Sequence, residues 1–425
     1  MAKQEFDRLR DISSNIKLRN IMLSYYMKAK FAWLFRKKIA WITSGGPVEP
    51  LIAMGITPIY PENHGAMIGA RKMGPELSDA AENLGYPRDL CSYFRCDVGH
   101  SILEKSPIDI RPKILKGRAL FGGGLPKPDV LVCCNNICGT VLKWYEVQAR
   151  YYNVPLILID TPYNYDGATD EILDYVTEQF KDMIPQLEKV TGKKFDEKEF
   201  ERVGLLANEG IQLWNEILQL SGSSVPSPMT CFDAFFYLAP IVTLRGTQLV
   251  VDYYKTLKEE LQSLADRKIG AVKNEQFRLV WDNLPIWFKM RRLSKTLAKY
   301  NAVLVGDTYT NAWADNDIQV DKPYESMARA YSTVFLNRNT QAKIENMIEL
   351  MGRYKADGFL MHSNRSCKPY SFGQLDIKDE VAKRTGKPGL MIEADMCDPR
   401  AYSDEQIETR IQAFIETLKE RKEVS

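Results

Sequence analysis

The chain has 425 residues and carries 57 Lys and Arg against 55 Asp and Glu, a net charge of +2. This length suits two or three domains, and the near balance of charge excludes the basic excess of a protein that wraps nucleic acid. A composition of 45% hydrophobic and 26% charged residues is typical of a folded globular protein. Eight Cys and three His are too few for a disulfide scaffold or for most His-rich metal sites.

The N-terminal residues give no sign of a secretory signal. Residues 1–20 carry charges throughout and lack an apolar core segment. The longest strongly apolar stretch, near residues 235–244, is too short to cross a bilayer. We therefore expect a cytoplasmic protein with no membrane association and with reduced thiols, in which clustered Cys indicate metal or redox chemistry.

The predicted elements alternate between strands and helices. Residues 1–37 are rich in Leu and Ile and free of Pro and Gly, which predicts N-terminal helices. Short apolar runs predict buried strands, a long helical pattern covers 168–264, and an amphipathic helix ends the chain at 403–422. The predicted strands cover residues 38–43, 129–134, 154–160, 302–307, 357–361 and 389–393.

Two segments of the chain resemble one another. KPDVLVCCNNIC at 127–138 and KADGFLMHSNRSC at 355–367 each contain a strand, a polar loop and a Cys, followed by a helix and a second strand that ends in an acidic residue. Coincidence between common strand–helix–strand units remains the alternative. The pattern predicts an α/β fold with two Rossmann-like (flavodoxin-like) parallel-sheet domains, a helical middle region and N-terminal helices. The predicted boundaries are 1–37 for the N-terminal helical segment, 38–166 for the first α/β domain, 167–295 for the helical connecting region and 296–425 for the second α/β domain.

Seven of the eight cysteines gather in four short segments. Three of these segments follow a predicted strand, and ligands of parallel α/β sheets bind beyond the carboxyl ends of the strands. All-thiolate ligation without a CxxC pair favours an iron–sulfur cluster over zinc. The alternative is that a cysteine is simply a buried apolar residue, which suits Cys231 among its Phe neighbours. The clustered residues are Cys91, Cys96, Cys133, Cys134, Cys138, Cys367 and Cys397.

Other catalytic motifs are missing from the sequence. It has no P-loop, since GAMIGARKMG lacks the required ending, and no GxSxG, HExxH or EF-hand motif. Glu49 and His362 are candidate proton donors, although Glu49 also suits a helix start and His362 a structural role. His64 and His100 lie near the segments of the clustered cysteines. Each is likewise either a proton donor or a structural residue.

The motifs resemble the 2-hydroxyacyl-CoA dehydratase and benzoyl-CoA reductase family over nearly the whole chain from about residue 38. This resemblance implies two Rossmann-like domains around an oxygen-sensitive [4Fe–4S] cluster that three cysteines hold, with one open iron. By motif these are Cys91, Cys138 and Cys367. It also implies a partner, a separate ATP-hydrolysing reductase with its own [4Fe–4S] cluster. The motifs are SGGPVEPLIAMGI, PENHGAMIGARKMG, DLCSYFRCDVG, NNICGTVLKWYE, PSPMTCFDAFFYLAPIVTLRGT, SNRSCKPYSFGQ and IEADMCDPRAYSDEQIETRIQAFIE.

Four further cysteines depart from the three-Cys pattern. They resemble the double-cubane branch of the family, whose [8Fe–9S] centre needs a second set of three thiolates. The resemblance implies Cys96, Cys397 and Cys134 for that set, with Cys133 as the alternative to Cys134. Arg95, Ser366 and Lys368 are candidate donors to the cluster sulfurs, although the two cations equally suit a solvated surface.

Three functions follow as hypotheses. The first is a homodimeric, ATP-dependent low-potential reductase, an oxidoreductase with a double-cubane cluster that reduces a small molecule. The second is the [4Fe–4S] subunit of a 2-hydroxyacyl-CoA dehydratase, a lyase, or of a benzoyl-CoA reductase, paired with a related second subunit. The third is an electron carrier without catalysis.

Overall fold

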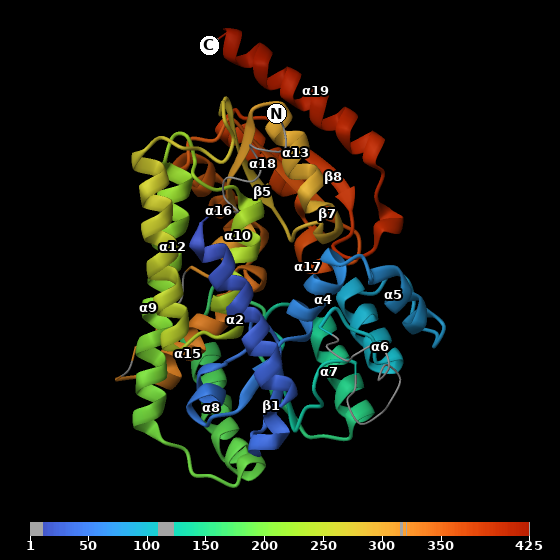
Figure 1. Ribbon diagram of the computed structural model, residues 1–425, viewed down its shortest axis with the longest axis vertical. Helices are drawn as coiled ribbons and strands as arrows, with labels where there is room; N and C mark the ends of the chain where they lie inside the picture. Colours follow the sequence, from blue (N-terminus) through green and yellow to red (C-terminus); the bar gives the residue numbers. More distant parts are fainter. Residues whose placement is uncertain (1–11, 109–122, 315–317, 320, 425) are drawn as a thin grey trace.

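The computed structural model describes residues 12–108, 123–314, 318–319 and 321–424. Two all-parallel, four-stranded sheets form two lobes, one above the other in Figure 1. The predicted two-sheet α/β fold is therefore confirmed. The first sheet has the order β2-β1-β3-β4, with β1 at Ile39–Ile42, β2 at Thr57–Ile59, β3 at Val130–Cys134 and β4 at Leu156–Ile159. The second has the order β6-β5-β7-β8, with β5 at Phe277–Asp282, β6 at Ala302–Asp307, β7 at Gly358–Asn364 and β8 at Gly389–Ala394.

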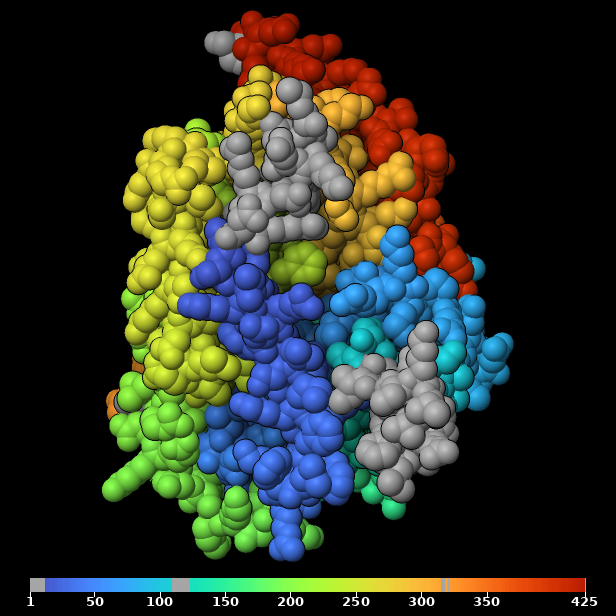
Figure 2. Space-filling view, viewed as in Figure 1, coloured from blue at the N-terminus to red at the C-terminus, as the bar shows by residue number. Residues whose placement is uncertain are grey.

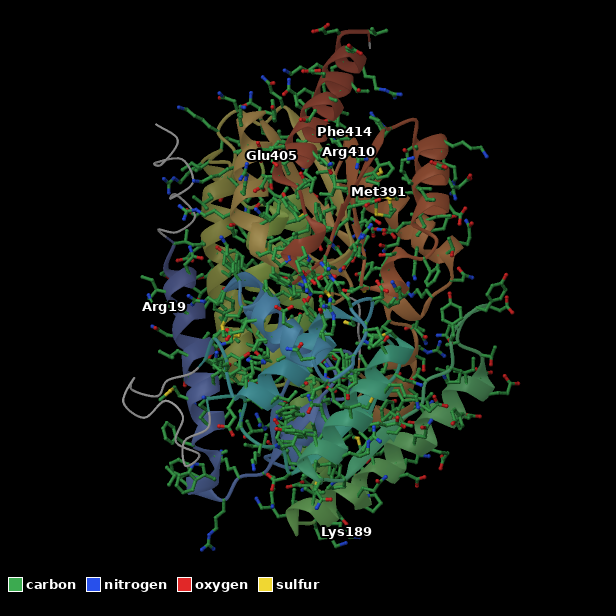
Figure 3. All side chains as sticks on the ribbon, turned by 90° about the vertical axis from the view of Figure 1, so that its right-hand side faces the viewer. Arg19, Lys189, Met391, Glu405, Arg410 and Phe414 are labelled. Atoms are coloured by element: carbon green, nitrogen blue, oxygen red, sulfur yellow. The ribbon has the colours of Figure 1, made fainter. Side chains whose placement is uncertain are left out.

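Helices cover both sheets. In Figure 1 the long helices α9 and α12 run side by side along one flank, and α2 lies across the front. Figure 3 places Lys189, near the end of α8, at the lower end of the molecule, and Met391 and Phe414 in the upper lobe. The helices of the first lobe and its N-terminal approach are α2 (Ser13–Lys30), α3 (Glu49–Ala53), α4 (Pro61–Ala70), α5 (Gly74–Glu82), α6 (Ser92–Leu103) and α7 (Gly139–Tyr152). Those of the middle region are α8 (Asp170–Thr191), α9 (Glu197–Ser223), α10 (Cys231–Tyr237), α11 (Ala239–Thr243) and α12 (Gln248–Asp266). The second lobe adds α13 (Met290–Lys299), α14 (Thr308–Asn311), α15 (Pro323–Ser332), α16 (Thr340–Arg353), α17 (Lys368–Ser371), α18 (Gln374–Thr385) and α19 (Asp404–Val424), and the short 3-10 helices are Ala32–Phe35, Trp287–Lys289, Phe335–Asn337 and Pro399–Ala401.

The predicted internal repeat is visible in the hydrogen bonds. Asp129, before β3, accepts from the backbone N of Ile39 at 2.9 Å, and its own N donates to the Ile39 carbonyl at 2.7 Å. Asp357, before β7, makes the same pair of bonds to Arg278, at 2.8 and 2.7 Å. Each Asp therefore bonds to the backbone at the start of the neighbouring strand. The two sheets share this hydrogen-bond pattern as well as the same order of strands.

Replacing Asp357 with Ala is expected to lower the free energy of unfolding by about 1–3 kcal/mol, because the backbone N–H of Arg278 loses its acceptor and Lys422 loses an ion pair. Chemical denaturation measures the change. Asp379→Ala, on a side chain that is 72% exposed, is the matched control and should change stability by less than about 0.5 kcal/mol. Equal effects of the two substitutions would refute the role of Asp357.

Three apolar cores hold the layers together. The largest joins both lobes, since it contains Trp41 and Leu131 of the first sheet and Trp281 and Leu360 of the second. A second core packs the opposite face of the first sheet against α8, α9 and α12, and a third packs the opposite face of the second sheet. The shared core fixes the lobes against each other and so fixes the geometry of whatever lies between them.

Two strands were missed from the sequence. β5 lies inside the segment 167–295 that was predicted to be helical, so the second α/β unit begins at Phe277 and not at 296. Its apolar run is interrupted by Arg278, whose buried guanidinium bonds to the carbonyls of Tyr354 and Ser224 at 2.9 and 3.1 Å. β2 has only three residues and contains Pro58, which masks a strand pattern. None of the helices in the described ranges has the length and apolar character of a membrane span.

Candidate functional site

Three of the predicted ligand cysteines line one cavity between the lobes. Cys91, Cys138 and Cys367 are the N-cap residues of α6, α7 and α17. All three border a cavity of about 150 Å³. The positive ends of α6 and α7 and backbone N–H groups therefore lie next to the thiols, an arrangement that favours negative charge on sulfur.

The electrostatics of these thiols reflect their convergence. Burial, with a smaller contribution from the nearby Cys138, raises the pKa of the Cys367 thiol to about 12, although the backbone N–H of Tyr370 opposes the rise. Burial and the proximity of Cys367 raise the pKa of Cys91 well above its ordinary value. The buried Lys343, whose Nζ donates to the Pro369 carbonyl at 3.1 Å, offsets negative charge at Cys367.

A hydrogen bond between the lobes holds two of these cysteines in place. The backbone N of Ser92, next to Cys91, donates to Ser366 Oγ at 3.1 Å, and Ser366 precedes Cys367. Ser366 Oγ in turn donates to Asp395. Ser366, predicted as a donor to cluster sulfurs, therefore bridges the two loops that carry Cys91 and Cys367.

The donor set fits an iron–sulfur cluster. Among the described His, Cys, Asp and Glu residues, the group whose ligand atoms all lie within 4.8 Å of one another is elsewhere, so the three thiols are spaced too widely for a single ion. Cys91, Cys138 and Cys367 would be the residues that hold a cubane cluster there, one thiolate each. The walls around them are largely apolar, which shields such a centre from water.

Glu62 and Ser44 were missed in the sequence and border the same cavity. The backbone N of Ser44 donates to Glu62 Oε1 at 3.0 Å, and the Tyr145 hydroxyl donates to Oε2 at 3.3 Å. Burial raises the Glu62 pKa to about 7, while these bonds oppose the rise. The buried hydroxyl of Ser44 has no partner among the described groups. Glu62 follows β2, so recognising that strand would have brought it to the carboxyl end of the sheet.

Cys96 and Cys397 form a separate buried pair. Their thiols interact directly, and Cys397 Sγ donates to the Gly65 carbonyl at 3.1 Å. Neither is among the residues that line the cavity. A Cβ at Gly69 would lie 2.8 Å from Cys397 Sγ, and one at Gly74 would collide with the Cys397 carbonyl. The glycines of GAMIGARKMG therefore allow α4 and the start of α5 to pack closely around Cys397.

Cys133 and Cys134 point to opposite faces of β3, as strand alternation predicts. Cys133 belongs to the core that joins the lobes and interacts electrostatically with Glu62 and Cys138. Cys134, the predicted ligand, lies in the other core, with Sγ 3.3 Å from Thr161 Oγ1. Cys133, rather than Cys134, thus lies in the core against which the cavity cysteines pack, although it does not line the cavity itself. Cys231 is buried away from the cavity beside Asp307.

Glu49 and His362 do not line the cavity. Glu49 is buried, and its Oε1 accepts from Arg245 Nε at 2.8 Å while its Oε2 accepts from the Tyr331 hydroxyl at 2.6 Å. His362 Nδ1 donates to the Leu284 carbonyl at 2.7 Å, and burial lowers its pKa to about 4. Both candidate proton donors therefore lie outside the cavity wall, and Glu49 contacts a cavity residue, Arg245.

The predicted cations near the cluster cysteines have other partners. Arg95 is buried and forms ion pairs with Glu82, at 2.5 Å, and Asp398, at 3.4 Å. Lys368 is exposed and donates to the Arg365 carbonyl at 2.8 Å. Neither lines the cavity. Lys343 lies behind the cavity wall and lowers the pKa of Cys367, whereas Arg245 is the cation that lines the cavity itself.

His64, Asp97 and His100 form the closest group of possible metal ligands in the described residues. His100 Nε2 accepts from the backbone N of Leu125 at 2.8 Å, so the proton of the neutral ring belongs on Nδ1. That nitrogen faces Asp97, 3.4 Å from Oδ1 and 3.2 Å from the carbonyl O. Since Nδ1 then has no lone pair for a metal, we interpret the group as a buried cluster in which His100 Nδ1 donates to the Asp97 carbonyl and lies next to the Asp97 carboxylate, with His64 beside it.

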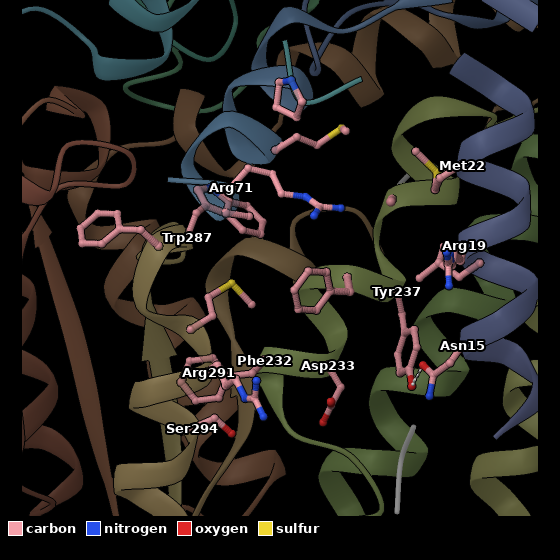
Figure 4. Close-up of a pocket in the computed structure, with 18 of the residues that line it drawn as sticks. Asn15, Arg19, Met22, Arg71, Phe232, Asp233, Tyr237, Trp287, Arg291 and Ser294 are labelled. Atoms are coloured by element: carbon pink, nitrogen blue, oxygen red, sulfur yellow. Dashed lines mark hydrogen bonds between the residues drawn. The ribbon is translucent and has the colours of Figure 1, made fainter. Parts of the chain in front are cut away.

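A larger cavity, of about 1470 Å³, lies on another face. Figure 4 shows it between α2, α4, α10 and α13, where Tyr237 donates to Asn15 at 2.9 Å across one side. In Figure 2 a hollow opens beside the blue helix α2. Basic side chains such as Arg19, Arg71 and Arg291 surround its aromatic floor, and none of its described lining residues is a Cys. This groove is therefore distinct from the thiol site.

Comparison with known proteins identifies the family. The model of the family described as "2-hydroxyglutaryl-CoA dehydratase, D-component" matches residues 43–418. The chain is 36% identical to the (R)-2-hydroxyisocaproyl-CoA dehydratase alpha subunit of Clostridioides difficile, over 97% of this chain and 98% of that protein. It is 34% identical to the lactoyl-CoA dehydratase subunit alpha of Anaerotignum propionicum, over 89% and 90% of the two chains, and 30% identical to a benzoyl-CoA reductase subunit of Thauera aromatica, over 91% and 90%. The chain therefore belongs to the 2-hydroxyglutaryl-CoA dehydratase D-component family, as the resemblance of its motifs predicted.

Proposed function

We propose that the chain is the [4Fe–4S]-bearing subunit of a 2-hydroxyacyl-CoA dehydratase. The observation that carries the proposal is the convergence of Cys91, Cys138 and Cys367, each the N-cap of a different helix, on one cavity between the lobes. These residues would hold the cluster. When bound, the cluster would supply single electrons at low potential.

The residues around the thiols provide proton chemistry and shielding. Glu62, with a pKa of about 7 set chiefly by burial, is able both to donate and to accept a proton near neutral pH. Ser44 offers an unpartnered hydroxyl at the same cavity. Loss of water from a 2-hydroxyacyl thioester needs proton transfer to the departing hydroxyl and from carbon, and Glu62 is the carboxyl group at this cavity that is suited to it.

Two partners complete the proposal. Two of the relatives are designated alpha subunits and another is designated a beta subunit, which supports a related second subunit in a heterodimer rather than the homodimer. The sequence has no P-loop, so we propose a separate ATP-hydrolysing reductase with its own cluster as the electron donor.

The test is an anoxic assay of the chain with its second subunit, a reductase of this family and ATP. Conversion of a 2-hydroxyacyl-CoA to the 2-enoyl-CoA supports the proposal. Reduction of an aromatic acyl-CoA without dehydration would favour the reductase branch of the family. Iron–sulfur content without binding of any acyl-CoA would favour an electron carrier.

A second candidate is the reductase with an [8Fe–9S] double cubane, and one observation favours it. Cys96 and Cys397 lie side by side, Cys397 interacts electrostatically with Cys91, and Cys133 does so with Cys138. Three further sulfurs therefore lie near the first three, whereas Cys134 lies on the far face of β3. A second cubane would require Cys96 and Cys397 to open away from each other and from Gly69, where space is tight.

Replacement of Cys96 or Cys397 by Ala separates the two candidates. With a single cubane, the iron content of anoxically purified protein should stay at about four per chain in both variants. With a double cubane it should start at about eight and fall by about half. Iron and acid-labile sulfide analysis measures this, and Cys231→Ala is the control for loss of a buried thiol away from the cavity.

A further inference from the structure

The cavity carries one buried cation besides the cysteines and Glu62. Of the described residues that line it, Arg245 and Glu62 are the two with side chains that bear a full charge in water. Arg245 is 3% exposed and extends from the segment between α11 and α12. Burying a guanidinium at this depth is costly unless other groups balance it.

Glu49 and Tyr331 balance that charge from behind. Arg245 Nε donates to Glu49 Oε1 at 2.8 Å, and Nη2 donates to the Tyr331 hydroxyl at 2.5 Å. The Tyr331 hydroxyl donates to Glu49 Oε2 at 2.6 Å, which closes a ring of three bonds. Arg245 also lies over the rings of Trp313 and Tyr331, 5.8 Å from each centroid. The guanidinium of Arg245 and the carboxylate of Glu49 thus form a buried ion pair, and the bonds among the described groups use Nε and Nη2 of Arg245 but not Nη1.

A carboxylate in this cavity would therefore find no free positive charge. The guanidinium is already paired with Glu49, and Glu62 adds negative charge above its pKa of about 7. The rest of the wall is mostly apolar and aromatic, as with Leu336 and Tyr370. An anionic group would lose its hydration without compensation, whereas an uncharged aliphatic or aromatic group would gain from burial.

We infer that Glu49 determines acyl specificity: by neutralising Arg245 it restricts the cavity to 2-hydroxyacyl-CoA substrates with an uncharged side chain. The inference rests on the proposed function and adds the substrate class. Glu49 is a positioning residue, since it touches Arg245 and not the cavity. Arg245 Nη1 remains as a donor for one neutral oxygen of the ligand.

The test measures binding by calorimetry on anoxically purified protein, with two probes: a 2-hydroxyacyl-CoA with a branched aliphatic side chain and one with a terminal carboxylate. Wild type should bind the aliphatic ester at least about tenfold more tightly. Glu49→Gln keeps the size of the side chain and frees the charge of Arg245, so it should narrow that ratio by at least about tenfold through tighter binding of the carboxylate ester. Glu146→Gln, on the exposed face of α7 and away from the cavity, is the control and should preserve the wild-type ratio.

The outcomes separate this inference from the proposed function. If wild type binds neither ester, the dehydratase proposal fails. If wild type binds both esters equally, or if folded Glu49→Gln protein keeps the wild-type ratio, the specificity inference fails while the dehydratase proposal stands. Should Glu49→Gln not fold, the wild-type ratio alone decides, because equal affinities overturn the inference.

Discussion

Protein with Cys138 replaced by Ser is expected to lose its iron–sulfur cluster and its activity. One of the three converging thiols is then gone, and a hydroxyl is a poor ligand for cluster iron, so the remaining two thiols hold an incomplete set. Iron content should fall from about four per chain to below about one, and the visible absorption of the cluster should disappear. Dehydration in the anoxic assay should fall at least about a thousandfold, a larger loss than is typical of an outer-shell substitution.

The same result is expected for Cys91→Ser and Cys367→Ser, because the three residues have equivalent N-cap positions. Cys134→Ser is the matched control: Cys134 lies in the same chain segment as Cys138, yet it faces the other core, beside Thr161. Full iron content in any of the three cavity variants would refute the assignment. Loss of iron in Cys134→Ser, with the fold intact, would show that Cys134 is a ligand after all.

The sequence predicted those parts of the fold that depend on regular patterns. β3, β4, β6 and β8 are apolar runs with clear ends, and their residues match the predicted strands closely. The repeat was also predictable, because Asp129 and Asp357 act locally on the strand beside them. β5 was not, since the burial of Arg278 depends on carbonyls of Ser224 and Tyr354, which are distant in sequence.

Some features of the candidate site could likewise be predicted from the sequence, and others could not. Strand ends indicated where Cys138 and Cys367 would lie, and the structure brings both to one cavity. The pairing of Cys96 with Cys397 could not be predicted, because it depends on how closely α4 packs against the loop after β8. The burial of Glu62, which sets its pKa, likewise depends on both lobes.

Glu62→Gln is expected to lower kcat by about a hundred- to ten-thousandfold, the usual contribution of a general acid–base group. Gln keeps the size of the side chain and an acceptor for the backbone N of Ser44, so binding of the acyl-CoA should change much less than kcat. In wild type, the pH dependence of kcat should include an apparent pKa near 7 that is missing from the residual activity of the variant. Glu146→Gln, on the exposed face of α7, is the control.

The pH dependence of the free energy of unfolding gives a second test of the Glu62 pKa. The Glu62 pKa is about 7 in the folded protein and near 4.5 in the unfolded chain, so the unfolded state releases its proton first as pH rises. The free energy of unfolding should therefore fall between about pH 4.5 and 7 by up to about 3 kcal/mol on account of Glu62, and Glu62→Gln should remove that part of the slope. Denaturation of wild type and variant at pH 5 and pH 8 measures the difference. If the variant is not relatively more stable at pH 8 than at pH 5, Glu62 is ionised in the folded protein and its role as a proton donor at neutral pH fails.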